Sequence, residues 1–252
     1  MVVKASIVSE QGRRDHMEDA YFLASNLAGK GWIFGGVYDG HRGSYAAEYA
    51  SKNIYRRFLG SFLRIHSPEK AFIRSYERVS KELSNQVSGT CAANFFIKDG
   101  KIYYANAGDA RIILVQKRQA LQLTAVHRAN MKFERDRIEM MGGKIEDGYV
   151  WSGQLGLQPT RTLGDEDFKR AGVIAAPSVG FHEITKDDLF LIAGTDGLFD
   201  VMGKSSIWDL MMMKGLNDAN EVARLLKEEV LKNPKARDNL TVIVLSLKQF
   251  WP

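Results

Sequence analysis

Hydrophobic and polar positions follow two different periods along the chain, and each period predicts a different kind of element. Runs rich in β-branched and aromatic residues, bounded by glycine or polar turn residues, predict strands. Residues 95–124 contain two turn signals, Asp99-Gly100 and the polar stretch 117–119, between such runs, so we expect consecutive antiparallel strands there. Further predicted strands are SIVSE, YFLAS, GWIFGGVYDG, DLFLIAGTDG and NLTVIVLSL.

Three other segments carry apolar residues at helical spacing. From Ser44 onwards apolar residues recur every fourth position, and Ser44 is placed to cap the first turn. A second helix is predicted over residues 72–83, with its apolar positions on one face. A third should begin at Asp218, which forms a capping box with Glu221, and end before Pro234.

The order of these elements separates two classes of mixed fold. Two successive helices follow the third strand, then come a β-meander and further helices, so the elements do not alternate as βαβ units. We therefore predict an α+β fold of antiparallel sheets with helices packed outside them. Residues 141–185 are irregular and contain several glycines, so we expect a mobile surface segment there.

Length and charge limit the classes of function. The chain has 252 residues, 45% of them hydrophobic, enough for one large domain or two small ones, and no linker divides it. The net charge is +5, and the basic residues are scattered rather than gathered in a run. Without a basic stripe or a nucleic-acid-binding motif, this charge indicates a solvated surface, and we expect no nucleic-acid partner.

Cysteine content and the N-terminal sequence bear on the compartment. The single cysteine, Cys91, allows no disulfide within the chain, which favours a reducing compartment. Its small, apolar neighbours in GTCAANFF predict a buried, unreactive thiol. The start MVVKASIVSE lacks the apolar core of a signal peptide, and no stretch approaches the ~20 apolar residues of a membrane span. We expect a soluble protein with no membrane partner.

The sequence VYDGHRG, residues 37–43, places a carboxylate and an imidazole around a glycine where a predicted strand ends. A simple turn would explain this stretch by itself. However, other carboxylates also lie at predicted strand ends, namely Glu18, Asp19, Asp109, Asp196, Asp200 and Asp238. If these converge, their repulsion is costly unless cations neutralise it. Oxygen ligands of this kind suit Mg²⁺ or Mn²⁺ rather than zinc, and two such ions form a clamp for phosphoryl chemistry.

Nine blocks spread over residues 5–246 carry a specific resemblance. In chain order they are RRDHMEDAYF, VYDGHRG, SGTCAANFF, YYANAGDARIIL, QLTAVHR, PTRTLGD, VIAAPSV, LIAGTDGLFDVM and RDNLTVIVL. With these blocks the chain resembles the metal-dependent serine/threonine protein phosphatases of type 2C. The resemblance implies a central antiparallel β-sandwich flanked by helices on both sides, in four layers α-β-β-α. It also implies one catalytic domain over residues 1–252, with a flap-like irregular segment around 166–187.

The resemblance assigns ligands for two Mg²⁺ or Mn²⁺ ions. It implies that Asp39 bridges both ions and that Asp196 and Asp238 complete the shell of the first. The Gly40 carbonyl and Glu18 would serve the second ion, partly through water.

Three further carboxylates receive lesser roles from the same resemblance. Asp109 and Asp200 match positions that hold a third, more weakly bound ion in some members of the family. Asp19 would orient ligands or bound water.

The resemblance also implies the chemistry. Arg14 matches the arginine that grips the substrate phosphate, with Arg13 as the adjacent alternative, and the planar fork of a guanidinium suits two phosphate oxygens. His41 matches the general acid that protonates the departing serine or threonine oxygen. The implied reaction is hydrolysis of phosphoserine or phosphothreonine in phosphorylated proteins, by direct attack of a metal-bound water or hydroxide. We expect a monomer in the cytoplasm or the nucleus.

Some blocks depart from the family pattern. Val126 stands before His127 where an aspartate is usual, and GTCAA replaces a more usual Gly-Ser-Thr-Ala run. These changes leave a second hypothesis open, a catalytically weak or inactive member that acts as a protein-binding adaptor. Against it, no candidate metal-site carboxylate has been lost.

Overall fold

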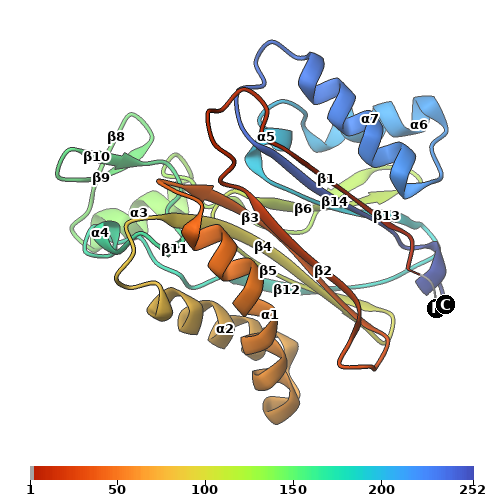
Figure 1. Ribbon diagram of the computed structural model, residues 1–252, viewed down its shortest axis with the longest axis horizontal. Coiled ribbons are helices and arrows are strands. Elements are labelled where there is room, and N and C mark those ends of the chain that lie inside the picture. The colour runs from red at the N-terminus through yellow and green to blue at the C-terminus, as the bar shows by residue number, and fades with distance from the viewer. Residues whose placement is uncertain (1–2) are drawn as a thin grey trace.

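Two antiparallel sheets form the centre of the molecule (Figure 1). The computed structural model describes residues 3–252. One sheet has the strand order β12-β5-β4-β3-β2, with β11 paired to β4. Its strands are β2 (Ala20–Leu27), β3 (Trp32–His41), β4 (Gly89–Lys98), β5 (Lys101–Ala107), β11 (Leu163–Gly164) and β12 (Ser178–Glu183).

The other sheet brings the two ends of the described chain together, because β1 pairs with β14. Its strand order is β1-β14-β13-β6-β7. The strands are β1 (Ala5–Glu10), β6 (Arg111–Gln116), β7 (Ala120–Gln122), β13 (Asp188–Gly194) and β14 (Leu240–Ser246). The strands predicted from sequence lie in these two sheets.

Helices cover both outer faces, which confirms the predicted four layers (Figure 1). Helices α1 (Tyr45–Ile65) and α2 (Pro68–Glu82) cover the first sheet with an aromatic cluster in which Phe58 lies 4.4 Å from Phe72 between ring centroids. Helices α6 (Lys204–Lys214) and α7 (Ala219–Lys232) cover the second sheet. Apolar residues of both sheets meet in a shared core between them, including Val37, Phe95, Ile112, Leu191 and Ile243.

The two predicted caps behave differently. Asp218 caps α7, because its carboxylate accepts from the backbone N–H of Asn220 at 2.8 Å and of Glu221 at 3.4 Å. Ser44 precedes α1, but its hydroxyl makes no capping bond and instead donates to the Glu48 carboxylate at 3.0 Å. None of the helices over residues 3–252 has the length and apolar character needed to span a bilayer.

Residues 132–169 contain elements that the sequence pattern did not predict. Helix α3 (Lys132–Met140) is followed by a small sheet of β8 (Lys144–Glu146), β9 (Tyr149–Ser152) and β10 (Leu155–Leu157). The expected flap-like segment at 166–187 instead begins with helix α4 (Glu166–Lys169) and contains β12, an edge strand of the large sheet. The strands β8 to β10 are three or four residues long, too short to show a clear alternation.

Candidate active site

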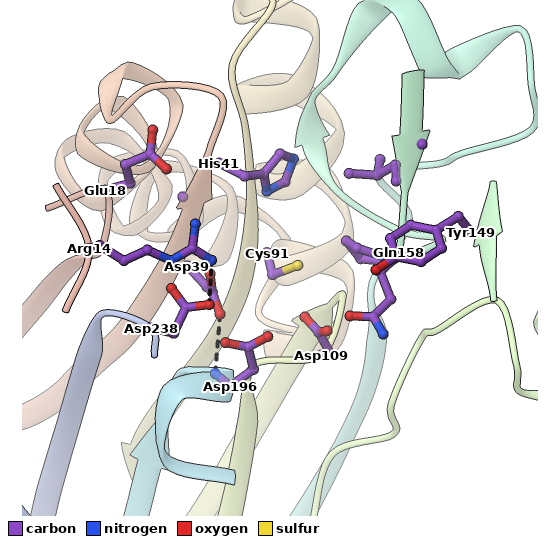
Figure 2. A pocket seen from close by; sticks show the side chains of 14 residues that line it. Arg14, Glu18, Asp39, His41, Cys91, Asp109, Tyr149, Gln158, Asp196 and Asp238 are labelled. Atoms are coloured by element: carbon purple, nitrogen blue, oxygen red, sulfur yellow. Dashed lines mark hydrogen bonds and ion pairs between the residues drawn. The ribbon is translucent and has the colours of Figure 1, made fainter. Parts of the chain in front are cut away.

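The residues singled out in the sequence meet at one end of the sandwich (Figure 2). Asp39 lies near the end of β3, and Asp196 begins α5 (Asp196–Phe199) directly after β13. Asp109 lies in the connection between β5 and β6, and Asp238 lies just before β14. They line a pocket of about 330 Å³ together with Arg14, Glu18, Gly40, His41, Cys91, Tyr149, Gly156, Leu157, Gln158 and Pro159.

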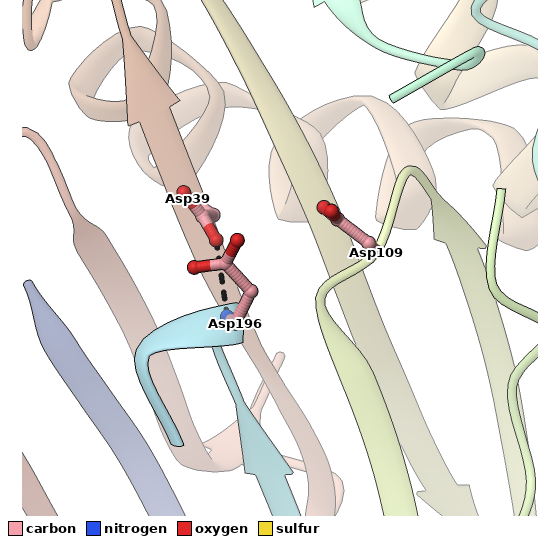
Figure 3. A group of neighbouring side chains, drawn as sticks. All are labelled: Asp39, Asp109 and Asp196. Atoms are coloured by element: carbon pink, nitrogen blue, oxygen red, sulfur yellow. Dashed lines mark hydrogen bonds between the residues drawn. The ribbon is translucent and has the colours of Figure 1, made fainter. Parts of the chain in front are cut away.

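Three carboxylates form the centre of this pocket (Figure 3). Asp39, Asp109 and Asp196 each offer an oxygen, and these oxygens lie within 4.8 Å of one another. The Asp196 backbone N–H donates to Asp39 Oδ2 at 3.1 Å, which fixes the start of α5 against the end of β3. This grouping of carboxylates could hold a divalent cation.

Electrostatic repulsion within the group is strong. Burial, and then the negative charges of Asp196, Asp19 and Asp109, raises the pKa of Asp39 well above its ordinary value. Burial and the charges of Asp109, Asp238 and Asp200 raise the pKa of Asp196 to about 8. Bringing these carboxylates together therefore favours either protonation or a bound cation.

Asp238, Glu18 and Gly40 also line the pocket, whereas the predicted metal-site residue Asp200 does not. Asp238 accepts from Arg14 Nη2 at 2.7 Å. The Glu18 carboxylate accepts from the Gly43 backbone N–H at 2.5 Å. At Gly40 a side chain would collide with the Glu18 carbonyl, so this position requires glycine.

Asp19 lies behind the carboxylate group. It accepts from the Thr195 hydroxyl at 2.9 Å, and burial raises its pKa to about 7. Thr195 immediately precedes Asp196, so this bond supports the backbone that presents Asp196. The arrangement is the one expected of a residue that orients ligands, a role that stays a prediction.

His41 has a partner that the sequence analysis did not identify. Its Nε2 lies 2.7 Å from Oδ2 of Asp165, a residue with no exposed surface. Arg42 lies 3.8 Å from the other oxygen of Asp165 and donates to Asp167 at 2.8 Å. Asp165 is the last residue of the block PTRTLGD. Its place in this family-like block was the one signal in the sequence that it belongs to the site.

Arg128 is the second residue that was missed. Its guanidinium donates to Asp109 at 2.6 Å, to Asp200 at 2.9 Å and to Asp196 at 3.2 Å. Arg111 also pairs with Asp200, at 3.4 Å. In the sequence, Arg128 is part of the block QLTAVHR, and its position directly after His127 was the one signal for it.

The departures from the family pattern lie close to the pocket. Cys91 pairs with Asp39 in the register of β3 and β4, and the residue is 2% exposed. Burial raises the pKa of Cys91 well above its ordinary value, in agreement with the predicted unreactive thiol. His127, next to Val126, is buried and its ring nitrogens face the Gly108 N–H at 3.2 Å and the Ser178 hydroxyl at 2.9 Å.

The wall opposite the carboxylates comes from residues 149–159 (Figure 2). It contains Tyr149 from β9, Leu157 from β10 and the following Gln158. A flap was expected at 166–187, and the residues of this wall lie before that segment, in β9, β10 and the chain directly after β10. This wall closes the side of the pocket that faces the carboxylates.

Comparison with known proteins decides the family. The family model described as "Protein phosphatase 2C" matches residues 3–240. The chain belongs to the protein phosphatase 2C family. "Probable protein phosphatase 2C 27" of Oryza sativa subsp. japonica is 32% identical over 277 residues, which cover 100% of this chain and 77% of that protein. "Probable protein phosphatase 2C 27" of Arabidopsis thaliana is 34% identical over 265 residues, covering 97% of this chain and 69% of that protein.

Solved structures show the same fold. The serine-threonine phosphatase 2C from Toxoplasma gondii has a TM-score of 0.82 at 23% identity, covering 97% of this chain and 94% of that chain. A C. elegans sex determining protein has a TM-score of 0.87 at 20% identity, covering 99% of this chain and 66% of that chain. Protein phosphatase 2C enzymes are serine/threonine phosphatases, and membership in the family places the chain in this enzyme class.

The protein phosphatase 2C family is metal-dependent, and the carboxylate group fits that requirement. Every candidate metal ligand is a hard oxygen atom. The negative charges of Asp39 and Asp196 repel each other, and neighbouring groups offset this repulsion only in part. The nearby thiol of Cys91 stays protonated because its pKa is raised. Such a donor set suits Mg²⁺ or Mn²⁺ better than a soft metal.

Proposed function

We propose that this chain is a phosphoprotein phosphatase that works with two divalent ions, Mg²⁺ or Mn²⁺. The observation that carries the proposal is the convergence of Asp39, Asp109 and Asp196 in a pocket that also contains Arg14 and His41. The convergence provides a cation site, the arginine an anion contact and the histidine a proton donor. Together these are the requirements for hydrolysis of a phosphate monoester.

The ligand assignment in this proposal follows the family resemblance. Asp39, Asp196 and Asp238 would hold one ion, and Asp39 with Glu18 and the Gly40 carbonyl would hold the other. When bound, the ions would offset the charge of the phosphoryl group and lower the pKa of the attacking water. Residues from segments spread between positions 14 and 238 meet in this one pocket, which supports a single catalytic domain over residues 1–252.

Arg14 would bind and orient the phosphate. Its side chain is 54% exposed and points to the same pocket as the carboxylates, with Asp238 as its partner at 2.7 Å. A bound cation at Asp238 would compete with Arg14 for that carboxylate and so release guanidinium donors for the phosphate oxygens. Arg13 instead donates to the Pro234 carbonyl at 3.0 Å and does not line this pocket, which favours Arg14 over Arg13.

His41 would give the proton to the departing serine or threonine oxygen from its Nδ1 atom, because Nε2 faces Asp165. Asp165 holds Nε2 at 2.7 Å, so the buried carboxylate fixes the ring orientation and favours a proton on the nitrogen facing it. With Nδ1 facing the substrate, His41 can donate this proton while Nε2 stays bonded to Asp165, so the ring need not rotate. His41 and Arg14 would thus act from neighbouring positions around one phosphate.

The proposal is tested with two substrates that differ in their leaving group. With Mn²⁺ or Mg²⁺ the protein should release phosphate from both a phosphothreonine peptide and p-nitrophenyl phosphate, and excess EDTA should abolish both reactions. The His41→Ala variant should lose about 100-fold on the peptide and far less on p-nitrophenyl phosphate, whose leaving group needs no proton. Equal losses on both substrates would contradict the general-acid role.

The adaptor hypothesis predicts peptide binding without phosphate release. A folded protein that binds the phosphothreonine peptide but releases no phosphate with either metal would support it. No observed feature favours this hypothesis, since all carboxylates of the proposed ion sites are present in the pocket.

A further inference from the structure

A third ion position was expected at Asp109 and Asp200, but a side chain of the protein already lies between these carboxylates. Arg128 donates through Nε to Asp109 Oδ2 and through Nη2 to Asp200 Oδ2, at 2.6 and 2.9 Å. The same Nη2 lies 3.2 Å from Asp196 Oδ2. One guanidinium therefore bridges the two carboxylates expected to hold a third ion and one expected to hold the first.

The surroundings of Arg128 make this a fixed arrangement. Its side chain is 14% exposed and that of Asp109 is 4% exposed, so their bond is shielded from water. Arg111, whose side chain is 16% exposed, lies 3.4 Å from the second oxygen of Asp200. Two guanidinium groups thus face three carboxylates, and both oxygens of Asp200 have a cationic partner.

We propose that Arg128 is a built-in cation that takes the place of the third metal ion. The inference rests on the proposed two-ion site. A divalent ion at Asp109 and Asp200 would need to displace a shielded guanidinium and would be repelled by it and by Arg111. The guanidinium contacts only one oxygen of Asp109 and one of Asp196, which leaves the other oxygen of each free of this contact.

This arrangement makes Arg128 a positioning residue for the carboxylates. By compensating Asp109, Asp200 and one oxygen of Asp196 from within the chain, Arg128 leaves Asp39 and the other oxygen of Asp196 without a guanidinium contact, where the two ions are proposed to bind. Phosphatase activity should then follow the filling of two ion positions and need no third.

The test counts Mn²⁺ ions bound to the metal-free protein, using the loss of the free Mn²⁺ EPR signal. The wild-type protein should saturate at two ions, whereas Arg128→Gln should bind an additional ion at least about tenfold more tightly than the wild type does. The additional ion should disappear again in the double variant Arg128→Gln/Asp200→Asn. Arg57→Gln is a control for the loss of a paired guanidinium, because Arg57 pairs with Glu82 at 2.7 Å between α1 and α2 and does not line the pocket.

Each outcome decides the inference. Equal affinity for a third ion in the wild type and in Arg128→Gln would overturn it, as would a variant that gains no ion. If Arg128→Gln does not fold, Asp200→Asn alone gives the answer: an unchanged ion count supports the inference, and a loss of one ion overturns it. A wild-type protein that binds no Mn²⁺ would contradict the proposed function. If Arg128→Gln then gained a Mn²⁺ ion that is lost again with Asp200→Asn, the role of Arg128 would still be supported.

Discussion

Asp39 and Asp196 lie close enough for the backbone of one to bond the side chain of the other, at 3.1 Å. Burial and mutual repulsion raise the pKa of both carboxylates, that of Asp196 to about 8. The fold therefore holds these residues in an arrangement that is unfavourable in their ionised form without a cation. Such stored repulsion is typical of a functional site rather than of a structural one.

The raised pKa values predict how the stability of the metal-free protein depends on pH. Asp19 and Asp196 have folded pKa values of about 7 and about 8, above the ordinary 3.8. A raised carboxyl pKa stabilises the folded state at low pH, and this contribution is lost as pH rises from about 4 through about 8. Mn²⁺ should therefore raise the melting temperature more at about pH 8 than at about pH 5.5.

Thermal unfolding at both pH values, with Mn²⁺ and with EDTA, measures this effect. The Asp196→Asn variant serves as the control, since it removes one of the titrating groups and should flatten the pH dependence in EDTA. Mn²⁺ shifts of equal size at both pH values would show that the carboxylates do not hold the ion.

A second prediction at this scale concerns the partner of His41. Asp165→Asn keeps the size of the buried side chain but removes the charge that faces His41 Nε2 at 2.7 Å. We expect about a tenfold loss on the phosphothreonine peptide and a smaller loss on p-nitrophenyl phosphate, as for a partner that orients a reacting group. The control is Asp167→Asn, which changes an exposed carboxylate that pairs with Arg42. This variant should leave both rates within about twofold of the wild type. Similar losses from both variants would argue against the pairing.

The sequence located most residues of the pocket because their carboxylates directly precede or follow strands. Asp39 and Asp196 could be placed in this way, since strand ends of a sandwich share an edge. Asp165 and Arg128 could not, because their partners His41 and Asp196 are 124 and 68 positions away in the chain. Such pairings depend on how the loops pack, which no local pattern encodes.

At the scale of elements, the strongly periodic helices were predicted and the short ones were not. Helix α7 begins directly after its capping residue Asp218 as expected, because a capping carboxylate and an apolar face coincide there. Helix α3 has nine residues, only two of them buried, Glu134 and Ile138, so its apolar pattern is too weak to predict a helix. A buried glutamate and one buried apolar residue, Ile138, attach α3 to the protein.

Glu134 is the centre of that attachment. It accepts from Arg161 at 2.5 Å, from Arg137 at 2.7 Å and from the Thr160 hydroxyl at 2.7 Å. Arg161 and Thr160 directly follow the pocket wall that ends at Pro159. The cluster thus connects α3 to the chain segment that faces the carboxylates.

We expect Glu134→Gln to lower the free energy of unfolding by about 3–5 kcal/mol, because it leaves two arginines without a buried counter-charge. Urea unfolding measures the change, and Glu139→Gln, an exposed position on the same helix, is the matched control. The pKa of Glu134 is lowered to about 2, so its stabilisation is present above about pH 4.5 and is lost as pH falls through about 2. A change no larger than that of the control would contradict a structural role for this cluster.

At the scale of the whole molecule, the four layers follow from the order of the elements and from the family resemblance. A core shared by both sheets, with residues such as Val37 and Leu191, holds the strand ends at a fixed separation. The carboxylates of Asp39 and Asp196 come from different sheets, so their spacing depends on the packing of the sandwich. The small sheet of β8 to β10 was not predictable, because strands of three or four residues gain their stability from packing rather than from pattern.

The central claim is that Asp39 holds the ions on which phosphoprotein hydrolysis depends. The most direct test is the rate of phosphate release from a phosphothreonine peptide as Mn²⁺ is titrated into metal-free wild-type protein and into Asp39→Asn. We predict a rate that rises with Mn²⁺ in the wild type and is at least about 100-fold lower in the folded variant at every Mn²⁺ concentration. An Asp39→Asn variant with the wild-type rate and the wild-type Mn²⁺ dependence would contradict the account.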